Sequence, residues 1–381
     1  MGSLVSKGFC NFYNYLCVRF TKHAIFCPMQ IKSLYALALV FCTTLSVRAF
    51  DAQDADTAFA AYTSAFYVAS NGFAYFKEDT SGGHSRFWVR AEQIEMLEDA
   101  YDRTHSDATR EMIKESIDGF IHRHSANWTT NEYNDDIMWM TIACARGYLA
   151  TGNQAWRDAA KQNFDAVFDR GYNDALGGGL WWTIGRKGKH SCVNGPAAIA
   201  ACLLCQIYND KSYLAKAEAI YTWERGALFN PSTGAIYDNM RLSGRIGRTT
   251  YTYNEGTFIG AADLLWKLTG DTNYLNDALL AANYTCKKIA RGKTLPAYGS
   301  GDGAGFNGIF LRWLERFVED DHLWPQFYPW MSLNANAAWS VRRADDLSWQ
   351  KWDKRTPDSK LDSWNCSDTV VILQVVPTKQ P

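Results

Sequence analysis

The chain repeats one pattern, in which a mostly apolar stretch is followed by a turn and then by an amphipathic stretch. Residues 137–149 are apolar on nearly every side, and Gly152 follows at the position that commonly ends a helix. Apolar residues then recur at a spacing of four from Trp156 to Phe168, with charged residues on the opposite face. Such pairs are predicted at 88–103 with 108–122, 137–149 with 156–168, 196–208 with 212–223, 256–268 with 274–289, and 309–319 with 330–339.

The turns of these pairs, near residues 104, 152, 210 and 270, are spaced by roughly 50–60 residues, a period typical of an array of helical hairpins. A helix that is apolar all round must be covered on every side. The pattern therefore predicts an all-α toroid with an inner ring of buried helices and an outer ring of amphipathic helices. Residues 59–69 are expected to form a first helix whose partner lies at the far end of the chain, and 235–238 with 248–253 a short β-hairpin.

The first 49 residues have the composition of a secretory leader. They contain five basic residues and no acidic residue, and residues 33–45 form a short apolar run after Lys32. Val47-Arg48-Ala49 fits a cleavage site for a signal peptidase. We interpret 1–28 as an extension before a start at Met29, 29–49 as a signal peptide, and 50–381 as a single catalytic domain; a signal anchor is the alternative for the leader.

Three sequons, at Asn127, Asn283 and Asn365, agree with a secreted glycoprotein, for which a cell-wall location is also open. The C-terminal residues show no hydrophobic tail of the lipid-anchor type, so we expect no stable membrane insertion. Six cysteines outside the leader permit up to three disulfides of unknown connectivity. They are Cys144, Cys192, Cys202, Cys205, Cys286 and Cys366.

Composition excludes several other classes of function. Lys plus Arg number 39 against 40 for Asp plus Glu, so there is no general basic field for nucleic acid. Cys202-x-x-Cys205 lacks the second ligand pair of a zinc site, and no dinucleotide or phosphate-loop fingerprint is present. We therefore expect no metal and no cofactor.

Two adjacent acids, Asp135 and Asp136, precede the buried stretch at 137–149. One interpretation is structural, because Asn134 or Asp135 could cap the helix start. The other is catalytic: two carboxyls in a partly desolvated cleft cannot ionise equally, so that one stays charged while the other holds a proton. Retaining glycosidases need one nucleophile and one general acid/base.

Aromatic side chains, of which the chain has 15 Trp, 20 Tyr and 20 Phe, provide flat surfaces for a sugar ring near this pair. Packing in the core is the alternative for each ring, and helix capping for the polar residues beside glycines. The candidate substrate-binding residues are Trp88, Tyr133, Asn134, Trp139, Trp181, Trp182, Asn194, Tyr253, Asn254 and Glu255.

These segments carry a resemblance to a known family. Tyr133-Asn-Asp-Asp136, Gly177-Gly-Gly-Leu-Trp-Trp182, Asn194-Gly-Pro196 and Tyr253-Asn-Glu-Gly256 resemble the signature segments of glycoside hydrolase family 76, the α-1,6-mannanases and their fungal cell-wall relatives. The resemblance implies an (α/α)6 barrel and a retaining mechanism, with Asp135 as nucleophile and Asp136 as acid/base. The chain departs from the family at Glu255, where Asn or Gln is usual.

The leading hypothesis is a secreted endo-acting α-1,6-mannosidase whose partner is α-1,6-linked mannan. A transglycosylase of the same fold, acting on mannan or on a glycolipid anchor, is the first alternative. A carbohydrate-binding wall protein without turnover is the second. Terpenoid chemistry on a helical toroid would need a longer Asp-rich motif than Asp135-Asp136-Ile-Met-Trp.

Overall fold

The computed structural model describes residues 49–381, so the predicted extension and almost all of the predicted signal peptide lie outside the described residues. Over residues 49–381 the chain forms six helical hairpins, five of which are the predicted pairs. These are α3 (Phe87–Thr104) with α4 (Asp107–His124), α5 (Asn134–Thr151) with α6 (Gln154–Gly171), α7 (Ser191–Tyr208) with α8 (Lys211–Ala227), α9 (Thr252–Thr269) with α10 (Thr272–Tyr284), and α11 (Phe306–Asp320) with α12 (Trp324–Ser340).

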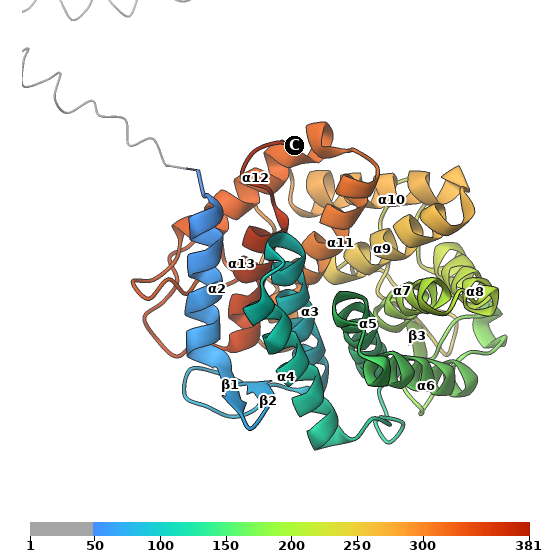
Figure 1. The fold of residues 1–381 in the computed structure, drawn as a ribbon. Coiled ribbons are helices and arrows are strands. Elements are labelled where there is room, and N and C mark those ends of the chain that lie inside the picture. The colour runs from blue at the N-terminus through green and yellow to red at the C-terminus, as the bar shows by residue number, and fades with distance from the viewer. Residues whose placement is uncertain (1–48) are drawn as a thin grey trace, which may run out of the picture. The chain divides into compact units, whose positions relative to one another are not determined.

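The sixth pair consists of one helix from each end of the domain. Helix α13 (Ser363–Val375) packs against α2 (Ala52–Phe66), and on the inner side it packs between α11 and α3 (Figure 1). The inner helices α3, α5, α7, α9, α11 and α13 thus form a closed ring, covered outside by α2 and the even-numbered helices. This arrangement confirms the predicted all-α toroid and gives the (α/α)6 barrel that the family resemblance implied.

The inner helices α5, α7 and α9 are buried along most of their length, as their apolar sequences predicted. Ala200 on α7 and Ala261 on α9 are completely inaccessible to solvent. Helix α7 is also long and apolar enough to cross a membrane, but 83% of it is buried inside the domain. Its composition is therefore explained by its place in the inner ring.

Helix α3 differs from the other inner helices because it buries charges. Arg146 from α5 and Arg312 from α11 both reach Asp99 on α3, at 2.8 Å and 2.7 Å from its two carboxylate oxygens. Arg146 also contacts Glu95 at 2.9 Å, and Arg312 contacts Glu92 at 2.7 Å. All five side chains are at least 95% buried. This network ties α3 to α5 and to α11.

The network holds more carboxyls than arginines. Burial, together with the neighbouring Glu95, raises the pKa of Glu92 to about 8. Burial also raises the pKa of Glu98, despite the nearby Arg146. Burial acts on Asp99 in the same direction, but its two arginine partners outweigh it and lower the pKa of that carboxyl. At neutral pH the network therefore holds Asp99 charged, while Glu92 and Glu98 retain protons.

Short strands and turns complete the domain, and two expectations were wrong in detail. Helix α2 ends at Phe66, where β1 (Tyr67–Ser70) pairs with β2 (Phe73–Phe76), so 59–69 is not helical throughout. The hairpin expected from 235–238 and 248–253 lies between them instead. Strands β3 (Gly188–His190), β4 (Asn239–Arg241) and β5 (Ile246–Gly247) form an antiparallel sheet, and η1 (Ala175–Gly177), η2 (Thr285–Ile289) and η3 (Gly301–Gly305) are short helical turns.

The six cysteines of residues 49–381 are all unpaired and buried, so none of the permitted disulfides forms in the described part of the chain. Each thiol lies inside a helix or its first turn, away from the surface loops. Their burial is consistent with the behaviour of Cys as a small apolar residue.

We expect Arg312→Met to destabilise the domain by about 3–5 kcal/mol, because it leaves Glu92 and Asp99 buried without their shared cation. Arg316→Met is the matched control, since Arg316 is 34% exposed and pairs with the half-exposed Asp102. That change should cost at most about 1 kcal/mol. Urea unfolding followed by circular dichroism measures both, and equal midpoints would contradict the role of the network.

Candidate active site

A cleft of about 780 Å³ opens where the inner helices begin. Its lining comes from the first residues of α3, α5, α7, α9 and α11 and from three connecting segments, which contain Trp182, Asp238 and residues 298–303. The residues around it are Arg86, Phe87, Trp88, Tyr133, Asp135, Asp136, Trp139, Trp182, His190, Cys192, Asp238, Tyr251, Tyr253, Tyr298, Ser300, Asp302, Gly303 and Phe306.

The helix starts that face the cleft lack the usual caps. Outer helices α2, α4, α6, α8 and α10 begin at Asp, Ser or Asn side chains that accept a hydrogen bond from the first turn. The caps of α3, α5, α7 and α9 are Arg86, Tyr133, His190 and Tyr251, and none makes such a bond. The first amides of α5 and α7 donate instead to the carbonyls of Trp182 and Asp238, each at 2.9 Å. The positive ends of these helices still face the cleft, where they favour negative charge.

Asp135 and Asp136 lie in the first turn of α5 and both line the cleft. The residue at the cap position is Tyr133, so the interpretation of Asn134 or Asp135 as the helix cap is wrong. Asp136 Oδ2 accepts a hydrogen bond from Asn131 Nδ2 at 2.9 Å, and Asp135 Oδ2 accepts one from the Cys192 thiol at 3.4 Å. Asp135 Oδ1 is inaccessible to solvent and has no hydrogen-bond partner.

Burial raises the pKa of both carboxyls. Burial and the negative charge of Asp136 raise the pKa of Asp135 to about 7. Burial raises that of Asp136 to about 6, with the Asn131 amide acting in the opposite direction. Two acids held this way titrate as a pair, and near neutral pH they share one proton between them. One charged carboxylate and one carboxylic acid therefore stand side by side.

Aromatic rings form the walls of the cleft. On one side Trp139 lies between Trp88 and Tyr253, with 6.5 Å between ring centroids in each contact. On the other side the Trp182 ring is stacked on His190 at 4.7 Å and contacts Tyr133 at 5.4 Å. Five of the six predicted aromatic residues therefore meet around the acid pair: Trp88, Tyr133, Trp139, Trp182 and Tyr253.

Three predicted binding residues do not line the cleft. Asn134 donates to Trp181 O at 2.7 Å and accepts from Arg170. Asn194 accepts from Leu180 N at 2.7 Å and donates to His190 O at 2.8 Å. The Trp181 ring is only 2% exposed. These contacts hold the segment after the three glycines so that Trp182, the next residue, faces the cleft.

Asn254 and Glu255 also lie behind the lining. Asn254 is buried and donates to the Asp238 carboxylate at 3.3 Å. Glu255 is buried and accepts from Ile236 N at 2.9 Å, and burial raises the pKa of its carboxyl. The two side chains position residues 236–238, of which Asp238 reaches the cleft.

Several lining residues were not predicted, among them His190, Cys192, Asp238 and the pair Arg86–Asp302, which are joined by a salt bridge. One signal could have found Cys192: the second residue of α3, α5, α7 and α9 lines the cleft in each case. These residues are Trp88, Asp135, Cys192 and Tyr253. Asp238 and Asp302 lie in loops, where helical periodicity gives no information.

His190 is mostly neutral at neutral pH, because burial lowers its pKa more than the nearby Asp238 raises it. The indole N–H of Trp182 makes no hydrogen bond, although it lies near enough to Asp135 to lower the pKa of that carboxyl. Asp135 Oδ1 and Trp182 Nε1 are both inaccessible to solvent and therefore lie just below the surface of the cleft. Among residues 49–381, no group of three His, Cys, Asp or Glu side chains is arranged to hold a metal ion.

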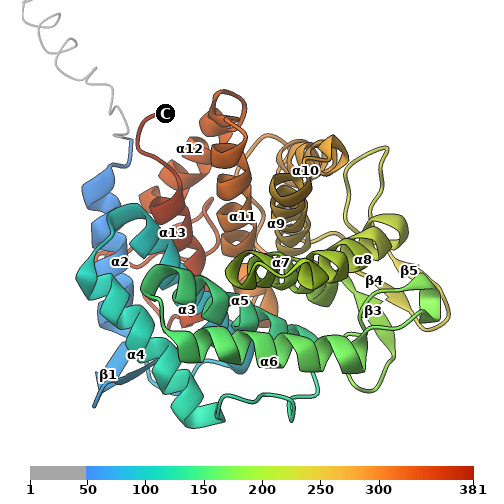
Figure 2. The ribbon, with the colours of Figure 1, turned by 45° about the vertical axis from the view of Figure 1, so that its right-hand side comes forward.

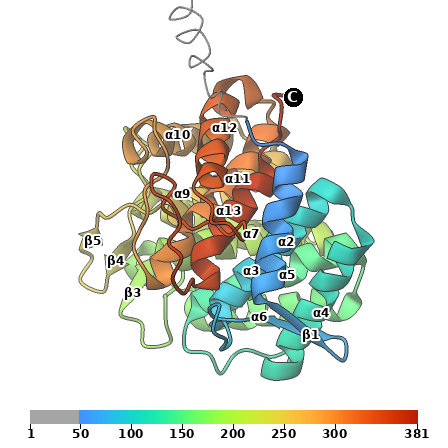
Figure 3. The ribbon, with the colours of Figure 1, turned by 90° about the vertical axis from the view of Figure 1, so that its left-hand side faces the viewer.

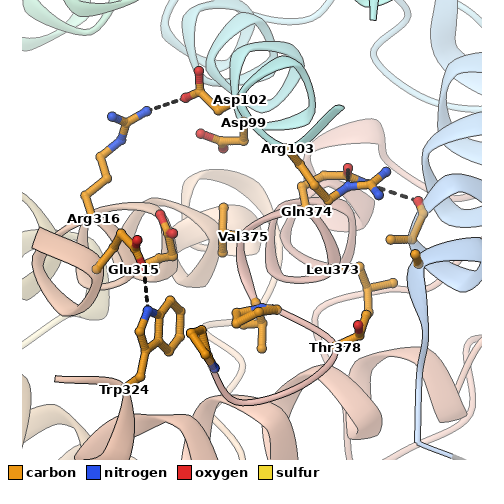
Figure 4. A pocket seen from close by; sticks show the side chains of 16 residues that line it. Asp99, Asp102, Arg103, Glu315, Arg316, Trp324, Leu373, Gln374, Val375 and Thr378 are labelled. Carbon is orange, nitrogen blue, oxygen red and sulfur yellow. Dashed lines mark hydrogen bonds and ion pairs between the residues drawn. The ribbon is translucent and has the colours of Figure 1, made fainter. Parts of the chain in front are cut away.

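A second cavity, of about 400 Å³, lies at the opposite ends of α3 and α11 and beside the end of α13 (Figure 4). Of the carboxyls that line it, Asp102 pairs with Arg316 at 2.6 Å and Asp99 belongs to the buried network, whereas burial raises the pKa of Glu315 to about 8. Arg103 bonds Gln374 at 2.7 Å. Trp324 is the one aromatic residue that lines this cavity, against several in the first cleft, so the first cleft is the better candidate for a substrate-binding site.

Comparison with known proteins decides the family. The family described as glycosyl hydrolase family 76 matches residues 51–376. The chain belongs to glycoside hydrolase family 76. Among its relatives, the mannan endo-1,6-alpha-mannosidases DFG5 and DCW1 of Candida albicans are 25% and 26% identical over 63% and 66% of this chain. The matches span 59% and 62% of those relatives' own lengths.

Solved structures of the family share the fold. The GH76A α-1,6-mannanase of a Salegentibacter species is 29% identical, with a TM-score of 0.79 over 85% of this chain and 98% of its own. An inactive variant of that enzyme, with two consecutive aspartates replaced by asparagine, is known in complex with α-1,6-mannotriose. A family 76 mannosidase of Bacteroides thetaiotaomicron is 20% identical, with a TM-score of 0.74 over 84% of this chain and 96% of its own. The (α/α)6 fold expected from the sequence is thus confirmed.

We expect Cys192→Ala to raise the pKa of Asp135, because the thiol donates to the charged form of that carboxyl and so favours it. A weak hydrogen bond predicts a rise of about half a unit. Carbon-13 NMR of the aspartate carboxyls across pH measures the change. Cys192→Ser should restore much of the lower value, and Cys286→Ala, a buried thiol outside the cleft lining, should change nothing. An unchanged titration in Cys192→Ala would contradict this role.

Proposed function

We propose that this protein is a retaining, endo-acting α-1,6-mannosidase, with Asp135 as the nucleophile and Asp136 as the general acid/base. The observation that carries the proposal is the carboxyl pair itself, which lines an aromatic cleft and shares one proton near neutral pH. Family membership supports it, as does the name of the relatives as mannan endo-1,6-alpha-mannosidases.

The first step forms a covalent glycosyl ester. The step starts with the shared proton on Asp136, which is the less populated arrangement because burial raises the pKa of Asp135 more than that of Asp136. Asp135 in its charged form then attacks the anomeric carbon while the bond from that carbon to the leaving oxygen breaks. Asp136 gives its proton to this oxygen, which departs as the hydroxyl of the shortened chain. The positive N-terminal end of α5 stabilises the negative charge on the attacking carboxylate of Asp135.

In the second step Asp136 acts as a general base instead of a general acid. Asp136, now charged, takes a proton from water as the water oxygen bonds to the anomeric carbon, and the ester bond to Asp135 breaks. Two displacements at one carbon retain its configuration. If a sugar hydroxyl replaces water, the same step joins two chains, and this is the transglycosylase alternative.

The rest of the cleft is suited to holding a sugar chain. Trp88 and Trp182 offer faces for the apolar sides of mannose rings, since such rings stack on indoles, whereas Trp139 is only 2% exposed and supports Trp88 from behind. Asp238 and the neutral His190 provide acceptors and a donor for hydroxyl groups. Incubation with α-1,6-mannooligosaccharides tests the proposal: shortened products indicate hydrolysis, lengthened products indicate transfer, and no change supports a binding protein.

We also propose that the protein is secreted and carries a glycan on Asn127 alone. Asn127 is exposed in a loop, whereas Asn283 bonds a carbonyl within α10 and Asn365 lies on the inner helix α13 beside the buried Ser367. A glycan on Asn365 would have to displace the packing of the inner ring. Peptide mass spectrometry of the secreted protein should therefore find the modification at Asn127, and modified Asn365 would contradict the expectation.

Asp135→Asn should remove turnover of every α-mannoside, because no glycosyl ester can form. Asp136→Asn should slow cleavage of mannan by about 10²–10⁴-fold, and an activated aryl mannoside should be partly spared because its leaving group needs less protonation. Initial rates on both substrates measure the effects.

Asp210→Asn is the matched control, since Asp210 caps the outer helix α8 and asparagine also caps well. Its rate should equal that of the unmodified protein. If Asp135→Asn or Asp136→Asn cleaves mannan at the same rate as this control, the pair has no catalytic role.

A further inference from the structure

Two neighbouring loops beside the cleft form an exposed surface that the proposed mechanism does not use. One loop precedes β3 and the other joins β4 to β5; Leu242 N donates to Lys187 O at 3.1 Å and so connects them. We call this surface the basic tip, and it consists of Ile184, Arg186, Lys187, Arg241, Leu242 and Arg245. The β3–β5 sheet lies at the edge of the domain, far from α2 and β1 (Figures 2 and 3).

The four cations of the basic tip have no acidic partner. None of them makes an ion pair within the described residues, although most arginines elsewhere in the domain do. The two segments that build the tip, 175–209 and 239–254, contain no acidic residue, although Asp174 and Asp238 precede them and Ile184 N donates to Glu132 O at 3.1 Å. Residues 50–381 as a whole hold 34 basic and 40 acidic residues, a net charge of −6. Positive charge is therefore concentrated here against the sign of the domain.

Two aliphatic side chains stand among these cations. Ile184 is 58% exposed and Leu242 is 63% exposed, and they are two of the six large hydrophobic residues exposed in the described chain. Leu242 follows β4 in the turn that contains Gly244, a position where polar residues usually stand. Each loop thus offers one aliphatic side chain beside its basic side chains.

We propose that the basic tip docks the protein onto an anionic phospholipid bilayer. Cations near such a surface are attracted to its headgroups, and aliphatic side chains gain by entering the boundary of the acyl chains. A soluble polyanion would use the cations but would leave Ile184 and Leu242 without a purpose. This peripheral contact requires no membrane-spanning segment.

The basic tip lies close to the cleft. Strand β3 begins next to Lys187 and ends at His190, which lines the cleft, so tip and cleft are roughly 10 Å apart along the strand. Docking would hold the cleft close to the bilayer surface. The inference goes beyond the proposed mannosidase activity and does not depend on it.

Co-sedimentation with vesicles tests the proposal. The protein should bind vesicles that contain phosphatidylserine and should not bind vesicles of phosphatidylcholine alone. Arg241→Glu with Arg245→Glu should weaken binding by at least about tenfold, since each cation near the surface contributes to attraction. Lys287→Glu with Lys288→Glu, an equal charge change at exposed residues of η2, is the control and should weaken it less.

A second pair of variants separates a bilayer from a soluble polyanion. Ile184→Ser with Leu242→Ser keeps all four cations and should weaken vesicle binding while leaving binding to heparin unchanged. Activity on soluble mannooligosaccharides should not change in any of these variants. Three results would overturn the proposal: no binding to anionic vesicles, equal loss in the η2 control, or vesicle binding that is unaffected by the serine pair.

Discussion

Two arginines buried against one helix are the interaction on which this domain depends. Arg146 and Arg312 come from α5 and α11, and both meet Asp99 on α3. A charged helix can take a place in the inner ring only because these partners neutralise it. The network therefore fixes where α3 begins relative to α5, and with it the position of Trp88 relative to Asp135.

The ring then determines the chemistry of the cleft. Because the inner helices run in the same direction, their starts gather at one end, and four of those that line the cleft have caps without a side-chain hydrogen bond. The positive ends of these helices favour negative charge, while burial opposes it. For Asp135 and Asp136 burial prevails, and both pKa values rise into the range where proton transfer at neutral pH is efficient.

The sequence predicted the toroid well because burial on all sides leaves a clear pattern, as in 137–149. The sequence did not indicate which polar residues are buried. Helix α3 was placed correctly, but its buried Glu92 and Asp99 could not be distinguished from an exposed charged face. Asn194 and Glu255 stand beside glycines like ligand-binding residues, yet they hold the chain behind the lining. Asp238 stands in a loop near β4 and has no periodic pattern that could have indicated its position.

The central claim is that Asp135 forms a bond to the sugar, and trapping of the glycosyl ester tests it most directly. A fluorinated mannosyl donor with a good leaving group forms the ester faster than water removes it, and peptide mass spectrometry then locates the adduct. The account predicts one added sugar on the peptide from the start of α5, at Asp135. An adduct on Asp136, on Asp238 or on any other carboxyl would contradict it.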